Sequence, residues 1–391
     1  MFDALIQFIR AQYGTNEFIP LHAPIFAGNE RSYVLETIDS TFVSSVGQFV
    51  DRFEREVAAY TGSPRAVATV NGTAALHAAL LLSGVRPGDL VLTQALTFVA
   101  TCNAIAYCGA EPVFLDVDRE TLGLSPTALS DWLEDHARLS EDGVCRTRRD
   151  DRPVRVCLPM HTFGHPADID GLMRICARWR LTMVEDAAES LGSLYQGRHT
   201  GTFGRLGILS FNGNKILTTG GGGMILADEA TGLRAKHLTT TAKRPHEYMF
   251  FHDEVGFNYR LPNLNAALGC AQLEQLDAFV ARKRALAAGY AEFFANGPFR
   301  FISEPARCRS NYWLNAVLCD SEAERDALLQ ATNARGIMTR PVWRLMSELP
   351  AFLHCGRDGL QNSRFLEARI VNLPSSVPGR RFDAERREEE S

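Results

Sequence analysis

The chain has 391 residues, enough for a large hydrophobic core and two domains. A hydrophobic content of 46% is typical of globular enzymes, and a net charge of −5 argues against a nucleic-acid binder. The nine cysteines form no CxxC or CxxH pair, so the sequence predicts no metal site. No stretch reads as a membrane span or secretion signal, and we expect a cytoplasmic protein with reduced cysteines.

Short apolar and β-branched runs predict the strands of a single α/β sheet. They cover residues 66–70, 90–94, 112–117, 154–160, 181–186, 207–212 and 223–228. Helical patterns lie between them, for example over 73–84 and 169–180. The charge-dense segment 134–155 is predicted to be an exposed loop.

A long helical pattern over 261–295 leads out of the sheet region. It predicts a bridge to a smaller α/β domain near the C-terminus. We therefore expect a large domain over residues 1–270, with the N-terminal segment, and a bridging helix with a small domain over 271–391. The charged tail 380–391 is expected to be a solvated helix end or disordered.

The first candidate for chemistry is the turn Asn71–Gly72 with Thr73 and Ala74, where a predicted strand passes into a helix. Free N–H groups at a helix start favour a phosphate group. An ordinary strand-to-helix turn that binds no ligand has the same sequence pattern. The dinucleotide motif GxGxxG is absent here.

Two further candidates follow predicted strands. Phe98 could lie over a flat cofactor ring or simply fill the core. Asp186 ends the strand 181–186, at the edge of the sheet where ligands bind. Its carboxylate could pair with a metal, a ribose hydroxyl or a protonated ring nitrogen, or it could cap a helix.

The most informative residue is Lys215, in SFNGNKILTTGGGGM, on a tight loop between two predicted buried strands. Taken alone it could be a solvated turn lysine, a phosphate binder or a nucleophilic amine. Pyridoxal phosphate chemistry requires a lysine, a carboxylate for the pyridinium nitrogen and a phosphate cradle. The chain offers these groups in order, with Ser210 as a hydroxyl near the phosphate.

These motifs, together with GFNYRLPNLNAALG, resemble the DegT/DnrJ/StrS family of sugar aminotransferases over nearly the whole chain. The resemblance implies the aspartate-aminotransferase-like fold type I, an α/β fold with a large mixed-sheet domain and a smaller C-terminal α/β domain. It also implies pyridoxal 5′-phosphate as cofactor and a homodimer with two shared active sites.

The resemblance also implies roles for single residues. Lys215 would form the Schiff base, and Asp186 would pair with the pyridinium nitrogen. The remaining cofactor contacts would be the N–H groups of Thr73 and Ala74 beside Gly72, the Ser210 hydroxyl, the Phe98 ring, and Asn258 from the partner subunit. Glu189 stands where His or Gln is common, next to the cofactor's O3′.

The segments EDAAESLGS, NGNKILTTGGGGM and GIMTRPVW are similar to the subgroup from bacillosamine and legionaminic acid pathways. That similarity implies amination of C4 of a UDP-linked 4-keto-6-deoxy-2-acetamido sugar with L-glutamate, for surface-polysaccharide synthesis. The candidate substrate contacts are His161, Arg260 and Arg340.

Three alternatives stay open. A sibling dehydratase class carries a histidine in place of the lysine, so Lys215 counts against it. A cofactor-binding regulatory protein would show a broken lysine or an added DNA-binding helix pair. A nicotinamide-dependent oxidoreductase would need the missing GxGxxG.

Overall fold

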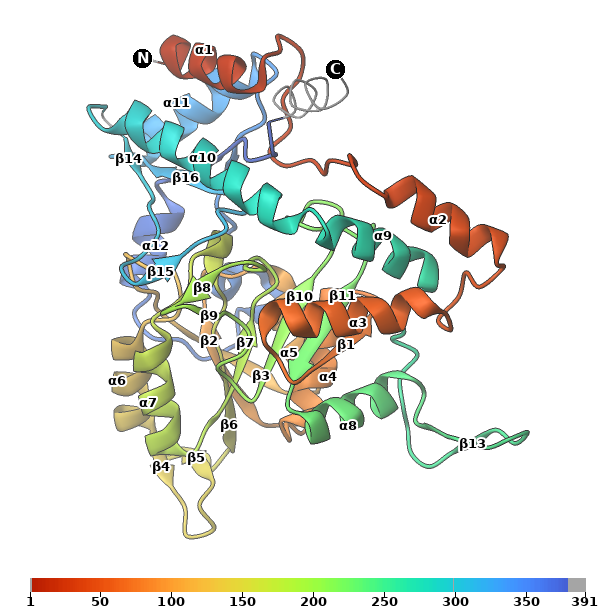
Figure 1. The fold of residues 1–391 in the computed structure, drawn as a ribbon. Helices are drawn as coiled ribbons and strands as arrows, with labels where there is room; N and C mark the ends of the chain where they lie inside the picture. The colour runs from red at the N-terminus through yellow and green to blue at the C-terminus, as the bar shows by residue number, and fades with distance from the viewer. Residues whose placement is uncertain (1, 298, 379–391) are drawn as a thin grey trace.

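The computed structural model describes residues 2–297 and 299–378, and its centre is a seven-stranded mixed sheet (Figure 1). The strand order is β1-β11-β10-β7-β6-β2-β3. The strands are β1 (Arg65–Thr69), β2 (Leu90–Gln94), β3 (Glu111–Leu115), β6 (Val154–Leu158), β7 (Thr182–Asp186), β10 (Leu206–Ser210) and β11 (Gly223–Ala227). Each of the seven predicted strands is confirmed.

Only β11 runs against its neighbours in this sheet, and the other six strands share one direction. Both faces are buried, which explains the near-continuous apolar runs. Ile208 belongs to the core on one face, and its neighbour Leu209 belongs to the core on the other. The carboxyl ends of β10, β7, β6 and β2 therefore meet at one edge, where polar side chains gather.

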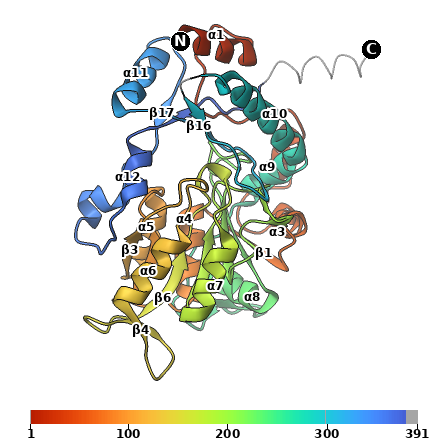
Figure 2. The same cartoon turned by 90° about the vertical axis from the view of Figure 1, so that its left-hand side faces the viewer.

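Helices cover both faces of the sheet (Figure 2). One face carries α4 (Gly72–Leu82), α5 (Val99–Tyr107) and α8 (Glu229–Thr239). The other carries α3 (Gln48–Thr61), α6 (Pro126–His136), α7 (Ile169–Trp179) and α9 (Asn263–Leu273). The helices expected over 73–84 and 169–180 are α4 and α7. No helix in the described part of the chain is long and apolar enough to cross a bilayer.

The segment 134–155, predicted as a loop, instead contains the end of α6 and a hairpin of β4 (Ala137–Leu139) and β5 (Cys145–Thr147). The prediction was wrong because it weighed charge alone. Cys145 and Thr147 alternate with Arg146, so one side of β5 is buried while the arginine reaches solvent.

The C-terminal part is built on an antiparallel sheet of order β14-β16-β18-β17. Its elements are α10 (Leu276–Phe294), β14 (Arg300–Phe301), β16 (Asn315–Leu318), α11 (Glu322–Asn333), β17 (Arg340–Pro341), α12 (Gln361–Glu367) and β18 (Ile370–Leu373). The helical pattern 261–295 breaks between α9 and α10, at Glu274 and Gln275. The charged tail 380–391 lies outside the described residues.

The N-terminal helix α1 (Phe2–Tyr13) packs on the C-terminal part, beside α10 and α11 in Figure 1. Leu5 and Ile9 share a core with Leu286 and Leu328. The predicted division at residue 270 falls inside α9 and counts α1 with the large domain, whereas α1 packs with the small one.

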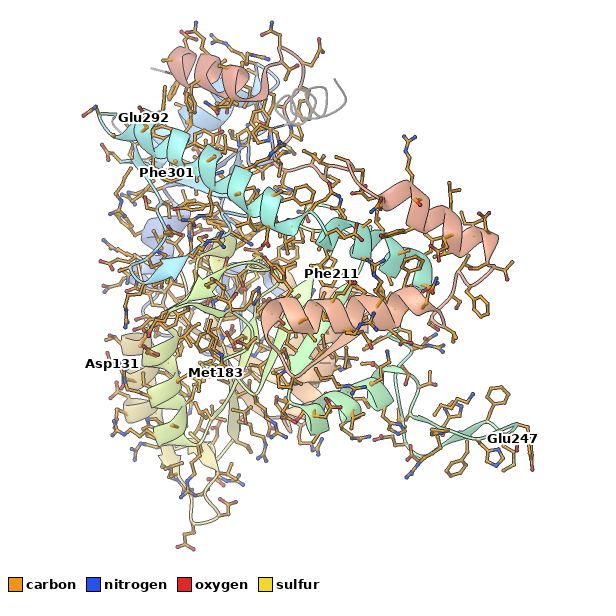
Figure 3. The ribbon with its side chains drawn as sticks, viewed as in Figure 1. Asp131, Met183, Phe211, Glu247, Glu292 and Phe301 are labelled. Carbon is orange, nitrogen blue, oxygen red and sulfur yellow. The ribbon has the colours of Figure 1, made fainter. Side chains whose placement is uncertain are left out.

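The remaining elements are short or peripheral. They are α2 (Glu30–Asp39), β8 (Leu194–Tyr195), β9 (Arg198–His199), β12 (Lys243–Arg244), β13 (Phe251–His252), β15 (Cys308–Arg309) and three single-turn helices at Thr162–Gly164, Met346–Glu348 and Pro350–Phe352. The β12–β13 hairpin projects from the body, with Glu247 near its tip (Figure 3).

Candidate active site

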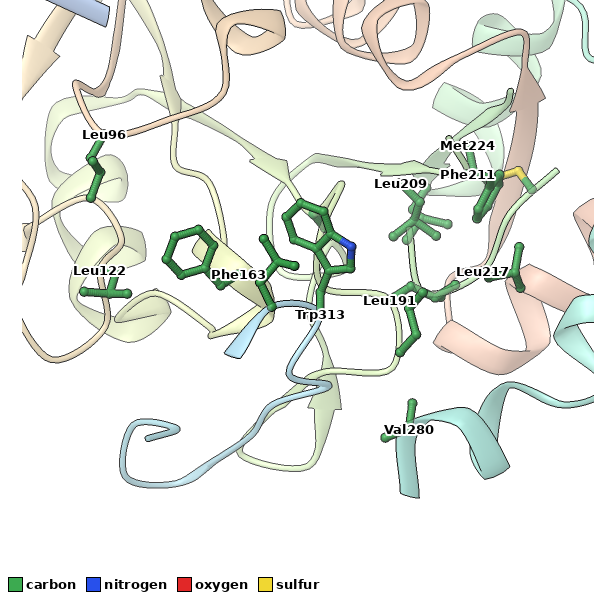
Figure 4. Close-up of a cluster of buried hydrophobic side chains, with 14 of the residues drawn as sticks. Leu96, Leu122, Phe163, Leu191, Leu209, Phe211, Leu217, Met224, Val280 and Trp313 are labelled. Carbon is green, nitrogen blue, oxygen red and sulfur yellow. The ribbon is translucent and has the colours of Figure 1, made fainter. Parts of the chain in front are cut away.

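A cavity of about 300 Å³ lies at the carboxyl ends of β7 and β10, beside the start of α4. It brings together seven of the residues predicted from the sequence. These are Gly72, Thr73, Phe98, Asp186, Glu189, Ser210 and Lys215. Figure 4 shows part of an apolar cluster that contains both Leu209 and Phe211 of the β10 region and Trp313 of the C-terminal part.

Asp186 presents a buried carboxylate to this cavity. It is 3% exposed, and Thr101 donates to its Oδ2 at 2.7 Å while the Ala188 N–H donates to its Oδ1 at 3.2 Å. Burial raises the pKa of the Asp186 carboxyl, and these two hydrogen bonds oppose the rise. No carboxylate–cation pair within 4 Å involves Asp186 in the described ranges. A protonated nitrogen in the cavity would supply the missing cation.

Lys215 is tied to the same cavity by two contacts. Its Nζ lies 3.3 Å from Glu189 Oε1 and 3.9 Å from the centre of the Trp313 ring. The other oxygen of Glu189 accepts the Phe163 N–H at 2.9 Å. Burial raises the pKa of Glu189 to about 7, although the charge of Lys215 opposes the rise. The sequence predicted Glu189 as a cofactor contact; the structure pairs it with the lysine.

The start of α4 is closed on one side by Ser210. A Cβ on Gly72 would lie 2.9 Å from Ser210 Cβ, so the turn needs a glycine to lie this close to β10. Ala74 does not line the cavity, and its N–H donates to Asn71 Oδ1 at 2.8 Å. The expectation that this N–H is free therefore fails here. The signal was in the sequence, since Asn is a strong N-cap residue.

Three aromatic side chains enclose the outer part of the cavity. Phe98 is half exposed, and its ring centre lies 6.2 Å from that of Trp343. Trp313 and Trp343 both line the cavity but come from the C-terminal part of the chain. Sequence reasoning missed both tryptophans. Only the motif GIMTRPVW, which contains Trp343, offered a signal.

The other predicted contacts lie outside this cavity. His161 is fully buried, accepting the Ala167 N–H on Nδ1 and lying 3.1 Å from Glu185 through Nε2, so it cannot reach a substrate. Asn258 is exposed and accepts a hydrogen bond from Arg260 Nε at 2.9 Å. Arg340 lines a neighbouring cavity.

The described residues contain one group with metal-ligand geometry, and none of its members lines this cavity. It consists of His237, Asp253 and Glu254, near the β12–β13 hairpin. Both carboxylates already pair with arginines, Asp253 with Arg244 and Glu254 with Arg234. These pairs neutralise the negative charge that would attract a metal ion.

The cavity fits pyridoxal phosphate. Asp186 is a buried carboxylate with no cation of the described residues within 4 Å, Lys215 offers an amine in the same cavity, and Gly72 and Ser210 form a close turn at a helix start. Asp186 would hold the ring nitrogen, and Thr73 and Ser210 would hold the phosphate.

The chain matches one protein family over most of its length. The model of the DegT/DnrJ/EryC1/StrS aminotransferase family matches residues 24–384. A pyridoxal phosphate-dependent aminotransferase candidate, EpsN of Bacillus subtilis (strain 168), is 38% identical over 336 residues, which cover 85% of this chain and 84% of EpsN. GDP-perosamine synthase of Caulobacter vibrioides is 36% identical over 363 residues, 91% of this chain and 93% of that enzyme.

Solved structures agree with this family. The aminotransferase TlmJ of Streptoalloteichus hindustanus superposes with a TM-score of 0.82 at 27% identity, covering 92% of this chain and 93% of TlmJ. The chain therefore belongs to the DegT/DnrJ/EryC1/StrS aminotransferase family and is a pyridoxal-phosphate-dependent sugar aminotransferase.

Proposed function

We propose that this enzyme transfers an amino group from L-glutamate to C4 of a nucleotide-linked 4-keto-6-deoxy sugar. The first candidate is UDP-2-acetamido-2,6-dideoxy-4-hexulose, on the resemblance of EDAAESLGS and GIMTRPVW to enzymes of that type. The amino sugar would serve surface polysaccharide or lipopolysaccharide synthesis. Nine free cysteines agree with a reaction in the reducing cytoplasm.

The observation that carries this proposal is the convergence of Lys215 and Asp186 on one cavity. Pyridoxal phosphate, when bound, withdraws electrons from the carbon next to the substrate nitrogen. The Asp186 carboxylate would keep the ring nitrogen protonated. Lys215 Nζ would move the proton between the substrate carbon and C4′ of the cofactor. Glu189 holds that amine in place through the 3.3 Å contact.

We also propose a homodimer in which Asn258 completes the partner's phosphate site. Asn258 is exposed and does not line the cavity of its own subunit. Large apolar side chains stand exposed nearby in the chain, with Tyr248 78% and Phe250 82% exposed on the hairpin. Exposed apolar groups of this size are typical of an interface.

A GDP-linked substrate is the second candidate. Relatives that are 34% to 36% identical to this chain are named GDP-perosamine synthases. The two candidates share the 4-keto-6-deoxy sugar ring and differ in the nucleotide and at C2.

The proposal is tested by incubating the purified enzyme with L-glutamate and a panel of UDP-, GDP- and dTDP-linked 4-keto sugars. We expect one amino sugar product with its nitrogen on C4, identified by mass spectrometry and NMR. Lys215→Ala should lower turnover by at least about a hundredfold and abolish the visible absorbance of lysine-bound cofactor. Lys236→Ala, which removes a lysine outside the cavity, is the matched control. Turnover retained by Lys215→Ala would refute the assignment.

A further inference from the structure

A second cavity, of about 630 Å³, adjoins the catalytic one. It lies between the segment after α1, α11 and the small sheet, and shares Asn214, Trp313 and Trp343 with the catalytic cavity. The two cavities meet at these shared residues, and the Trp313 ring contacts Lys215 Nζ on the catalytic side. A molecule that reacts at Lys215 could therefore extend into the second cavity.

Two residues of this second cavity have buried polar atoms without a hydrogen-bond partner among the described residues. Asn372 is 3% exposed, and its Oδ1 is unsatisfied. Neither ring nitrogen of His22 has a partner within residues 2–297 and 299–378. Burial and the charges of Lys283 and Lys215 hold the pKa of His22 well below its usual range, so its neutral ring offers one donor and one acceptor. Unsatisfied buried polar groups are costly and are expected where a ligand completes them.

Three arginines line the same cavity, and in the described part of the chain one of them has no carboxylate partner. Arg325 pairs with Asp326 at 2.7 Å, and Arg344 pairs with Glu348 at 2.9 Å. Within the described ranges, Arg340 makes no such pair. It lies opposite Asn372 in the antiparallel β17–β18 register, so both side chains lie on one face of the sheet.

The catalytic cavity cannot supply this charge. Among the described residues that line it, Lys215 is the single cation, and it faces the carboxylates Asp186 and Glu189. The proposed substrates both carry anionic oxygens away from the reacting carbon, as phosphates of the nucleotide or as a carboxylate of glutamate. These groups need a cation outside the first cavity.

We propose that the second cavity binds the anionic oxygens of the substrates, with Arg340 as the cation and Asn372 and His22 as hydrogen-bonding groups. This inference rests on the proposed function, because it takes the substrates from it. Phosphate and carboxylate present the same chemistry to an arginine, and the experiment below separates them.

The test is isothermal titration calorimetry of the cofactor-loaded enzyme with UDP and, separately, with 2-oxoglutarate. Arg340→Gln should weaken the binding of at least one probe by about tenfold or more. Arg344→Gln is the matched control, since Arg344 lines the same cavity but is paired with Glu348; it should stay within about twofold of wild type. Asn372→Asp, which places a carboxylate beside Arg340, should weaken the same probe. Thermal midpoints verify that the variants fold.

The probe that loses affinity identifies the source of the anion. Loss for UDP assigns the cavity to the nucleotide phosphates, and loss for 2-oxoglutarate assigns it to the amino donor. Wild-type enzyme that binds neither probe, or Arg340→Gln with unchanged affinity for both, overturns the inference. Binding is measured without turnover, so this test is independent of the activity test. If Arg340→Gln loses affinity but the wild-type enzyme aminates no keto sugar, the proposed substrate is refuted and the anion site is retained.

Discussion

At the scale of single residues, the pair Glu189 and Lys215 is the most unusual feature of the site. A carboxyl with 1% of its side chain exposed faces an amine at 3.3 Å. Its neighbour Asp186 is buried as well, so among the described residues that line this small cavity two acids face a single cation. Because burial raises the pKa of Glu189 to about 7, this carboxyl changes its protonation state near neutral pH.

That pKa predicts how stability changes with pH. A carboxyl whose pKa is higher in the folded state binds more protons there than in the unfolded chain. The free energy of unfolding therefore falls as the pH rises from 4.5, the ordinary pKa of a glutamate, through 7. Glu189→Gln removes this loss. In cofactor-free protein, the stability of the variant relative to wild type should rise by about 2 kcal/mol between pH 5 and pH 7.

Urea unfolding at three pH values in this interval measures that difference. Glu247→Gln, at the exposed tip of the hairpin, is the control and should track wild type at every pH (Figure 3). A constant difference between Glu189→Gln and wild type would show that Glu189 is already ionised at pH 5.

At the scale of elements, the contact between the start of α4 and the end of β10 shapes the phosphate side of the cavity. Gly72→Ala would place a Cβ 2.9 Å from Ser210 Cβ and 3.2 Å from its Oγ. The turn or the serine must then shift, so we expect the affinity for pyridoxal phosphate to fall by about tenfold.

Equilibrium dialysis of cofactor-free protein with pyridoxal phosphate measures this effect. Gly213→Ala is the control, because a Cβ there would meet its nearest neighbour, Gly220 O, at 3.9 Å. Equal affinities of the two variants would show that the turn can move without disturbing the phosphate site.

The same element shows why the sequence predicts part of the site and not the rest. Apolar runs buried on both faces predict the strands, and the strand ends place Asp186, Ser210 and the loop of Lys215 at one edge. Asn71 is a strong N-cap residue, so the sequence allows two uses of the Ala74 N–H, and only the structure shows that the Asn71 side chain accepts it.

The residue pattern of the sequence also does not predict contacts between distant parts of the chain. Trp313 and Trp343 reach the cavity because the C-terminal part shares a hydrophobic core with the large sheet. The hairpin over 137–147 was not predicted because its sequence is highly charged. In this two-stranded hairpin the alternation of buried and more exposed side chains along β5 decides the structure, and the overall composition does not.

At the scale of the whole molecule, two exposed apolar surfaces suggest how subunits meet. One is α2 and the segment after it, where Leu35, Ile38 and Phe42 are each at least half exposed. The other is the hairpin with Phe250, which projects from the body in Figure 1. Surfaces of this kind are unfavourable in a monomer and are typically covered by a partner.

The proposed homodimer, with Asn258 reaching the partner's active site, makes a quantitative prediction for mixed dimers. Lys215→Ala and Asn258→Ala should each be nearly inactive alone. In a hybrid dimer, one site takes Lys215 from one subunit and Asn258 from the other and is intact, while the second site has both defects. Subunits unfolded together and refolded as an equal mixture should regain about a quarter of the wild-type activity, since half of the dimers are hybrids with one working site each.

The matched control is a mixture of Lys215→Ala with Asp186→Asn. Both of these residues line the cavity of their own subunit, so no hybrid contains an intact site and no activity should return. Recovery in the first mixture and not in the second requires Asn258 to act across the interface. If the first mixture stays as inactive as its parents, Asn258 serves its own subunit, and the exposed position that the structure gives it must change when the cofactor binds.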